Sequence, residues 1–190
     1  MLTSAGPGEG KSTTTANVAV AFAQSDRKVL VIDADLRKPT MHHTFHRSNR
    51  RGLTTILTGQ ADWQGTVIDT DVPNLDLLPS GPVPPNPSEM LASKRMGDLL
   101  DQLKEHYDMI VIDTPPALAV TDAQIMATRC DGVVLVIQAG KVKKDAALKL
   151  KANMDFVKAR ILGVVLNNVD RKNGEGYYYY YYYGTENESK

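Results

Sequence analysis

The sequence predicts an α/β fold in which a mostly parallel central sheet carries helices on both faces. Apolar, β-branched runs without alternating polar residues indicate strands that are covered on both sides. These runs are 29–32, 109–112, 133–137 and 161–166. Helical periodicity separates them, most clearly over 87–106 and 143–158. Strands that alternate with helices in this way are typical of parallel strands joined by right-handed crossovers.

The composition is that of an ordinary soluble globular protein. The chain of 190 residues is 42% hydrophobic and 23% charged, which fits one α/β domain. Lys plus Arg equals Asp plus Glu at 22 each, so charge gives no argument for a nucleic-acid partner, and none is predicted. The single cysteine, Cys130, excludes an internal disulfide and reads as a buried small hydrophobe. Neither a signal peptide nor a bilayer-spanning apolar run is present.

The first element is a short apolar strand, 1–3, followed by a glycine-rich loop and a helix over 14–24. The loop reads Ala5-Gly6-Pro7-Gly8-Glu9-Gly10-Lys11-Ser12-Thr13. A strand, a glycine turn and a helix N-terminus form the phosphate-binding loop of P-loop NTPases, where backbone N–H groups and the helix dipole attract phosphate. Ala5 replaces the glycine of the strict pattern. The Gly-Lys-Ser-Thr ending disfavours the alternative, an accidental Lys-Ser after a glycine turn.

The loop predicts a nucleotide site with defined roles. Lys11 supplies a positive charge to the β- and γ-phosphates, and the Ser12 hydroxyl is a ligand for Mg²⁺. Nucleotide contacts are expected from Gly6, Pro7, Gly8, Glu9, Gly10, Lys11, Ser12, Thr13 and Asn167. Asn167 ends the last strand, where its amide can read a purine edge. The run Asn167-Asn168-Val169-Asp170 resembles the Asn-Lys-x-Asp signature of GTP-binding proteins, but the lysine is missing, so ATP is favoured over GTP.

Carboxylates stand where two strands end, at Asp33, Asp35 and Asp113. Ligands of such sheets bind beyond the carboxyl ends of the strands, so these groups should converge on the loop. Mg²⁺ takes only one or two carboxylates beside phosphates and waters. We expect Ser12 and Asp33 on or near the metal, Asp113 acting through a bound water, and Asp35 as general base. Turn chemistry is the alternative for Asp33 and Asp35, and Arg37 is expected to pair with these carboxylates or with phosphate.

Residues 39–86 are less regular. A short helix is expected from Gly52 to Leu57, and a short strand from Leu75 to Leu78. The proline-rich stretch 80–87 is interpreted as a rigid turn before a helix with Ser88 as its N-cap, in preference to an extended partner ligand. His42, His43 and His46 would form a metal site if positions 42 and 46 shared a helix face, but a solvated or core-edge cluster is favoured.

The C-terminal residues change character. A domain over 1–170 is predicted, followed by a flexible tyrosine-cluster tail over 171–190. The tail holds the consecutive phenols Tyr177, Tyr178, Tyr179, Tyr180, Tyr181, Tyr182 and Tyr183. Beside a phosphate-transfer site these are expected phosphoacceptors, whose full modification adds roughly −10 to −14 charges. A low-complexity accident is the alternative.

These features together resemble the catalytic domain of bacterial tyrosine kinases (BY-kinases), which accompany capsule and exopolysaccharide export. The resemblance covers nearly the whole chain. It rests on Thr3–Thr13 (Walker A), Val31–Pro39 (Walker A′), Leu78–Gly81 with Pro84–Leu91, Tyr107–Pro116 (Walker B) and the tyrosine cluster. It implies ATP- and Mg²⁺-dependent autophosphorylation in trans, with Lys11, Asp33, Asp35 and Asp113 as essential residues.

The resemblance also implies partners and a location. It implies a cytoplasmic protein held at the inner face of the membrane by a transmembrane activator, a cognate tyrosine phosphatase and a ring-shaped homo-oligomer. The family carries a further helix before the first strand, with a Glu/Arg motif at the subunit interface. This sequence begins at Met1, almost on the loop, so ring assembly is expected to lack that helix. The unbroken tyrosine run also departs from the family's usual spacing.

Two further classes share parts of this pattern. A ParA/MinD-type ATPase switch has the loop and the strand-end aspartates, but such proteins commonly carry a second lysine early in the loop. No lysine precedes Lys11 here. A catalytically inactive scaffold, phosphorylated by another kinase, is the other class. The filled catalytic positions favour activity.

Overall fold

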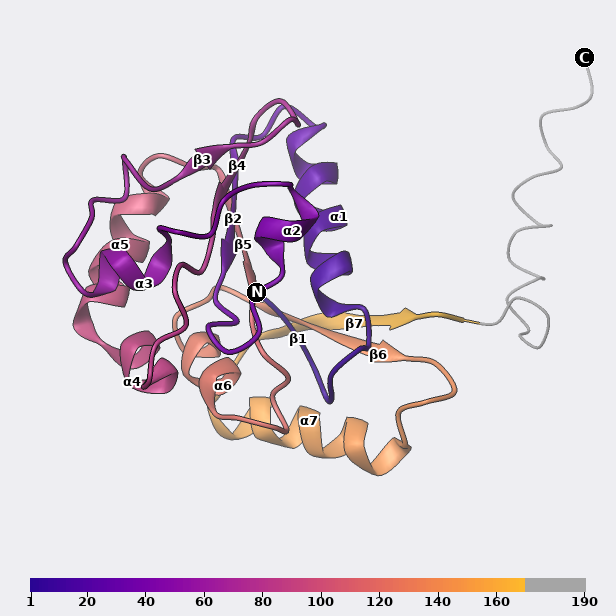
Figure 1. Ribbon diagram of the computed structural model, residues 1–190. Coiled ribbons are helices and arrows are strands. Elements are labelled where there is room, and N and C mark those ends of the chain that lie inside the picture. Colours follow the sequence, from indigo (N-terminus) through magenta and orange to yellow (C-terminus); the bar gives the residue numbers. More distant parts are fainter. Residues whose placement is uncertain (170–190) are drawn as a thin grey trace, which may run out of the picture.

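The computed structural model describes residues 1–169 of the chain and contains a seven-stranded sheet (Figure 1). The strands are β1 Leu2–Ser4, β2 Val29–Asp33, β3 Ile68–Asp69, β4 Leu75–Leu78, β5 Met109–Asp113, β6 Val133–Gln138 and β7 Ile161–Asn167. Their spatial order is β3-β4-β2-β5-β1-β6-β7, and only the β3–β4 pair is antiparallel. The predicted mostly parallel α/β fold is confirmed, and the predicted tail over 171–190 lies outside the described residues.

Helices cover both faces of this sheet (Figure 1). They are α1 Lys11–Ala23, α2 Met41–Thr44, α3 Leu53–Leu57, α4 Pro87–Ala92, α5 Lys94–Lys104, α6 Asp122–Ala127 and α7 Lys144–Phe156. Alternate residues of β2 show the two layers. Val29 and Val31 pack in the cluster that contains α1, whereas Leu30 and Ile32 pack with α3, α4 and α5. Because both faces are buried, the strand reads as a continuous apolar run.

The expected helix over 87–106 is in fact two helices, and its predicted cap is wrong. The helix is interrupted at Ser93, whose backbone is extended. The Ser93 hydroxyl accepts a hydrogen bond from the N–H of Met96 at 3.3 Å and so caps the second helix. Helix α4 begins at Pro87, with Asn86 rather than Ser88 at the N-cap. Proline suits the first helical position because its missing N–H would have no partner there. The Ser88 side chain is free to contact Asp122 instead.

The histidine arrangement that a metal site would need does not form. Helix α2 ends at Thr44, and His46 follows it with a φ of 51°, so His42 and His46 do not share a helix face. Within residues 1–169, no group of three or more His, Cys, Asp or Glu side chains is arranged to hold a metal ion. Cys130 packs against the core, and burial raises the pKa of its thiol.

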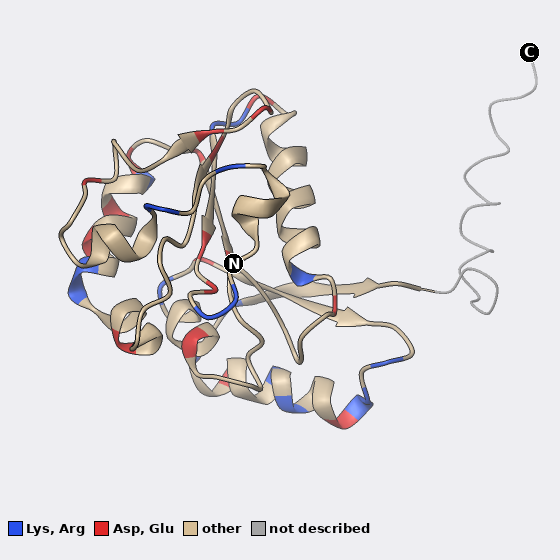
Figure 2. Ribbon diagram, in the orientation of Figure 1, with Lys and Arg blue, Asp and Glu red and all other residues tan. Residues whose placement is uncertain are grey.

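Charged residues occupy the helices and loops around a sheet that is largely uncharged (Figure 2). The exceptions that matter for function lie at the strand ends, where Asp33 of β2 stands directly opposite Asp113 of β5 in the parallel register. Both carboxylates are fully buried. Of the helices in the described part of the chain, none is long and apolar enough to cross a membrane.

Candidate functional site

The loop between β1 and α1 has the backbone form that its glycines predict. Gly8 and Gly10 have φ angles of 74° and 84°, in the left-handed region that favours glycine. A Cβ on Gly10 would lie 1.9 Å from the side-chain nitrogen of Asn167. That nitrogen donates a hydrogen bond to the carbonyl of Glu9 at 3.0 Å. Asn167 is therefore brought to the loop as expected, where its amide nitrogen contacts the loop backbone.

Lys11, Ser12 and Asp113 form a compact cluster beneath the loop. The Lys11 ammonium lies 2.7 Å from Oδ1 of Asp113, and the Ser12 hydroxyl donates to Oδ2 of Asp113 at 2.7 Å. The ammonium also donates to the Ser12 hydroxyl at 3.0 Å. Lys11 is 7% exposed and Asp113 is fully buried. The convergence of the strand end on the loop, predicted from the sequence, places these groups in direct contact.

Thr15 also belongs to this cluster, although no sequence motif marks it. Its hydroxyl donates to Oδ1 of Asp113 at 3.0 Å, and the side chain is fully buried. Position 15 lies one helical turn after Lys11, so both side chains occupy the same face of α1. That spacing is the signal from which Thr15 could have been found.

Asp33 is held rigidly at the end of β2. Its Oδ2 accepts the backbone N–H groups of Thr40 and Met41, both at 2.9 Å, and its Oδ1 accepts the N–H of Asp35 at 3.2 Å. Burial, followed by the charge of Asp113, raises the pKa of Asp33 to about 7. A carboxyl with that pKa exchanges its proton near neutral pH, and a nearby cation would favour its ionised form.

Asp35 faces the same cluster from the loop after β2. Its Oδ1 accepts the backbone N–H of Lys38 at 3.0 Å and that of Arg37 at 3.3 Å, and the residue is 7% exposed. Burial raises the pKa of Asp35, while the charge of Lys11 opposes this effect, which places both groups in one electrostatic environment. A carboxylate with a raised pKa beside a phosphate loop has the properties of a general base.

Glu9, expected to contact nucleotide, turns inward in this structure. Its Oε1 accepts the N–H of Gly6, and the residue is only 3% exposed. Its Oε2 is buried, with no hydrogen-bond partner among the described residues. The Glu9 side chain thus closes the turn from Gly6 to Glu9.

Lys141 is a second cation at the loop, and no sequence motif marks it. It lies after β6, and its ammonium is 3.8 Å from the position that a Cβ on Gly8 would take. Polar residues follow the strand at 133–137, which indicates that this segment lies at the carboxyl end of the sheet. No motif distinguishes Lys141 from the other residues there.

The expected pairing of Arg37 with the site carboxylates is wrong. Its guanidinium contacts Asp122, the first residue of α6, through Nε at 2.9 Å and Nη2 at 3.0 Å. Asp122 is fully buried, and no sequence pattern had identified it. The Arg37 guanidinium is therefore held by the start of α6 and not by a site carboxylate.

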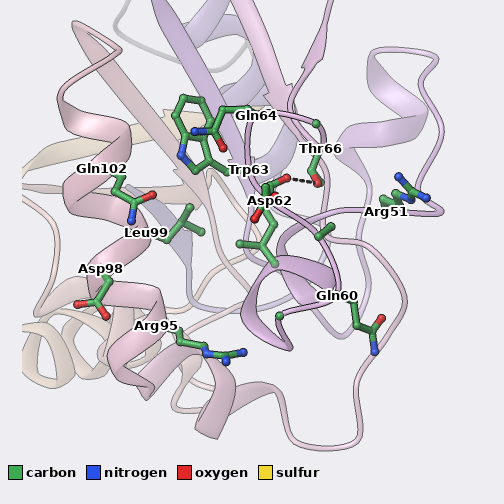
Figure 3. A pocket seen from close by; sticks show the side chains of 14 residues that line it. Arg51, Gln60, Asp62, Trp63, Gln64, Thr66, Arg95, Asp98, Leu99 and Gln102 are labelled. Carbon is green, nitrogen blue, oxygen red and sulfur yellow. Dashed lines mark hydrogen bonds between the residues drawn. The ribbon is translucent and has the colours of Figure 1, made fainter.

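An open hollow of about 960 Å³ lies elsewhere, between α3, the segment after it and α5 (Figure 3). Trp63, Arg51 and Arg95 line it together with amide and acidic side chains. None of the predicted site residues lines this hollow. The candidate site is therefore defined by the loop and the strand ends.

Comparisons with known proteins identify the family to which the chain belongs. The family model described as an AAA domain matches residues 3–163. Tyrosine-protein kinase YwqD of Bacillus subtilis (strain 168) is 51% identical over 167 residues, covering 88% of this chain and 70% of YwqD. The solved kinase domain of Escherichia coli tyrosine kinase ETK is 36% identical with a TM-score of 0.88, covering 92% of this chain and 68% of that one.

The ATPase alternative is represented by the septum site-determining protein MinD of Pyrococcus horikoshii, solved with Mg-ADP. It is 26% identical with a TM-score of 0.74, covering 87% of this chain and 68% of that one. Both kinases are more similar to the chain in sequence, and ETK is also more similar in shape. The likeness to MinD is a likeness of overall fold. With its phosphate loop, its strand-end carboxylates and these relatives, the chain belongs to the bacterial tyrosine kinases and is a protein-tyrosine kinase.

Proposed function

We propose that this kinase transfers the γ-phosphate of ATP to tyrosines of its own C-terminal cluster, Tyr177 to Tyr183, in trans. The observation that carries the proposal is the cluster of Lys11, Ser12 and Asp113 directly beneath the glycine loop. The tyrosine run follows β7 in the sequence, and β7 ends at this same loop through Asn167. Transfer between chains, rather than within one chain, is supported by the resemblance alone.

The loop and its lysines would bind the triphosphate. Backbone N–H groups over Gly8 to Thr13, at the start of α1, would provide donors for the phosphates, whereas the N–H of Gly6 is bonded to Glu9 and Pro7 has none. Lys11 would exchange Asp113 for the β- and γ-phosphates, since both partners are anions. Lys141 stands beside Gly8 and would add positive charge at the mouth of the loop.

Ser12, Asp33 and Asp113 fit Mg²⁺, because hydroxyl and carboxylate oxygens are the ligands that this hard cation prefers. The Ser12 hydroxyl and an Asp113 oxygen are already 2.7 Å apart, and Asp33 stands opposite Asp113 in the sheet. When bound, the ion would neutralise negative charge on the triphosphate.

Asp35 would act as the general base. The phenol oxygen of the acceptor tyrosine attacks the γ-phosphorus, and the bond from that phosphorus to the β–γ bridging oxygen breaks. The phenol proton passes to the Asp35 carboxylate, and ADP leaves. The raised pKa of Asp35 supports this role, because proton transfer is most effective when the pKa of the base is close to the working pH.

In the cell, this chemistry would regulate capsular or exopolysaccharide synthesis and export. A transmembrane activator would hold the kinase at the inner face of the membrane, a cognate tyrosine phosphatase would reverse the modification, and a ring-shaped homo-oligomer would present each tail to a neighbour. The family resemblance supports each of these assignments.

A mixing experiment tests the acceptor and the route together. A Lys11→Met chain with an intact tail is incubated with Mg²⁺, ATP and an active chain that lacks residues 171–190. Phosphate on the tyrosine run of the Lys11→Met chain is the expected result. Transfer in trans is excluded if the Lys11→Met chain stays unlabelled while an intact active chain labels its own tail. In that case the fraction of tails labelled per unit time should not depend on protein concentration.

A further inference from the structure

We propose that Arg37, Asp122 and Ser88 form a clamp that positions Asp35 for proton transfer. The inference rests on the proposed role of Asp35 as general base and assigns three residues that position it. It also gives a purpose to the proline-rich stretch before α4, which the catalytic site leaves unexplained.

Asp122 is the centre of the clamp. Its two carboxylate oxygens accept hydrogen bonds from Arg37, at 2.9 Å from Nε and 3.0 Å from Nη2. The Ser88 hydroxyl donates to Oδ1 of Asp122 at 2.5 Å, and Arg37 Nη2 lies 3.1 Å from that hydroxyl. Asp122 is fully buried, whereas the Arg37 side chain is 38% exposed. A planar guanidinium that meets both oxygens of a carboxylate fixes direction as well as distance.

The proline-rich stretch places Ser88 in the clamp. Pro87 is buried at the first position of α4, which leaves Ser88 in the first turn of the helix beside α6. Asn86, not Ser88, occupies the N-cap position, and the Ser88 hydroxyl donates to Asp122 from inside the first turn. Helices α4 and α6 therefore hold the clamp from two separate segments of the chain.

Arg37 links the clamp to Asp35. The side chain of Arg37 is fixed on Asp122, while its backbone N–H donates to the Asp35 carboxylate at 3.3 Å. The adjacent N–H of Lys38 donates to the same oxygen at 3.0 Å. Movement of the guanidinium would therefore shift the two donors that orient the proposed base. On its other side the loop is fixed through Asp33, which accepts the N–H of Asp35.

The tests are steady-state kinetics and amide hydrogen exchange on Ser88→Ala and Asp122→Asn chains. Each is expected to lower kcat for tyrosine phosphorylation, by roughly tenfold or more in the case of Asp122→Asn, because small misplacements of reacting groups are costly. The KM for ATP should stay close to wild type, since the phosphate loop is untouched. Amide exchange over residues 35–38 should become faster.

Ser88→Thr is the conservative variant, since it keeps the hydroxyl, and it should recover most of the kcat lost in Ser88→Ala. Arg129→Gln is the matched control. The Arg129 guanidinium also joins the helical layer, donating to the carbonyls of Ala92 at 2.6 Å and Ser93 at 3.1 Å, but it does not contact the Asp35 loop. This variant should leave both kcat and exchange over 35–38 unchanged.

A double-mutant cycle completes the test. Arg37→Gln combined with Asp122→Asn should lose little more kcat than either single change, because both remove the same link. The clamp would be disproved if the fold-losses of kcat in the two single variants multiplied in the double variant. It would also be disproved if amide exchange over 35–38 were unchanged in Ser88→Ala and Asp122→Asn. If the wild-type chain shows no tyrosine phosphorylation, the proposed function fails, while the exchange measurement still decides whether the clamp holds the loop.

Discussion

The ammonium of Lys11 lies 2.7 Å from Oδ1 of Asp113, and the two residues come from the start of α1 and the end of β5. Both are buried, so each neutralises the other away from water. A buried charge without a partner costs far more than an exposed one. This pair therefore contributes to the fold as well as to the site, and phosphate must compete with Asp113 for the lysine.

Lys11→Met is expected to abolish phosphate transfer, weaken ATP binding and destabilise the chain by about 3–5 kcal/mol, because the Asp113 charge is left buried and unpaired. Chemical denaturation and ATP titration measure the two effects. A Lys11→Met/Asp113→Asn double variant should recover most of the stability without recovering activity. An unchanged free energy of unfolding in Lys11→Met would show that the Lys11–Asp113 ion pair does not stabilise the fold.

Asp35→Asn is expected to keep ATP affinity and lose transfer. The amide oxygen can still accept the N–H of Lys38, so the loop keeps its form, but the side chain can no longer take a proton. Isothermal titration of ATP with Mg²⁺ and a kinase assay separate these properties. An equal loss of ATP affinity would identify Asp35 as a metal ligand instead of a base.

The raised pKa of Asp33 predicts a pH dependence of stability. Between about pH 4 and pH 7 the unfolded chain has released the proton, while folded Asp33, with a pKa of about 7, retains it. The free energy of unfolding therefore falls as pH rises through this window. In EDTA without nucleotide, Asp33→Asn should show a flatter decline than wild type. Parallel curves for the two chains would contradict the raised pKa.

Gly10→Ala is expected to weaken ATP binding and to destabilise the chain by at least about 1–2 kcal/mol, because its φ of 84° is costly for any residue with a Cβ. The new methyl would also collide with the Asn167 amide. Gly163→Ala is the matched control, since a Cβ there meets nothing within 4 Å. Equal ATP affinity in Gly10→Ala and Gly163→Ala would show that the left-handed backbone at Gly10 is not needed for ATP binding.

The parts of the site that the sequence predicted are those encoded by local pattern. Glycines before Lys11 and Ser12 indicate a phosphate loop because few other structures need them, and an apolar run that ends in Asp113 indicates a strand end. Parallel strands place such ends at one edge, so the contact between Lys11 and Asp113 follows even though 102 positions separate them.

The parts that could not be predicted depend on tertiary packing. Arg37 and Asp122 are 85 positions apart, and nothing local distinguishes Asp122 from other helix-start aspartates. The helical period runs unbroken through Ser93, where the chain nevertheless turns, because capping by its own hydroxyl starts a new helix. Asn167 similarly gave no sign that its amide would contact the loop backbone.

The most direct measurement is the incubation of purified chain with Mg²⁺ and γ-labelled ATP, followed by mass spectrometry of the peptide after Lys172. We expect phosphate on tyrosines among Tyr177 to Tyr183, and its loss in the Lys11→Met chain. ATP binding without phosphate on any of these tyrosines, even at high protein concentration and with an activator segment added, would show that the tyrosine cluster is not the phosphate acceptor.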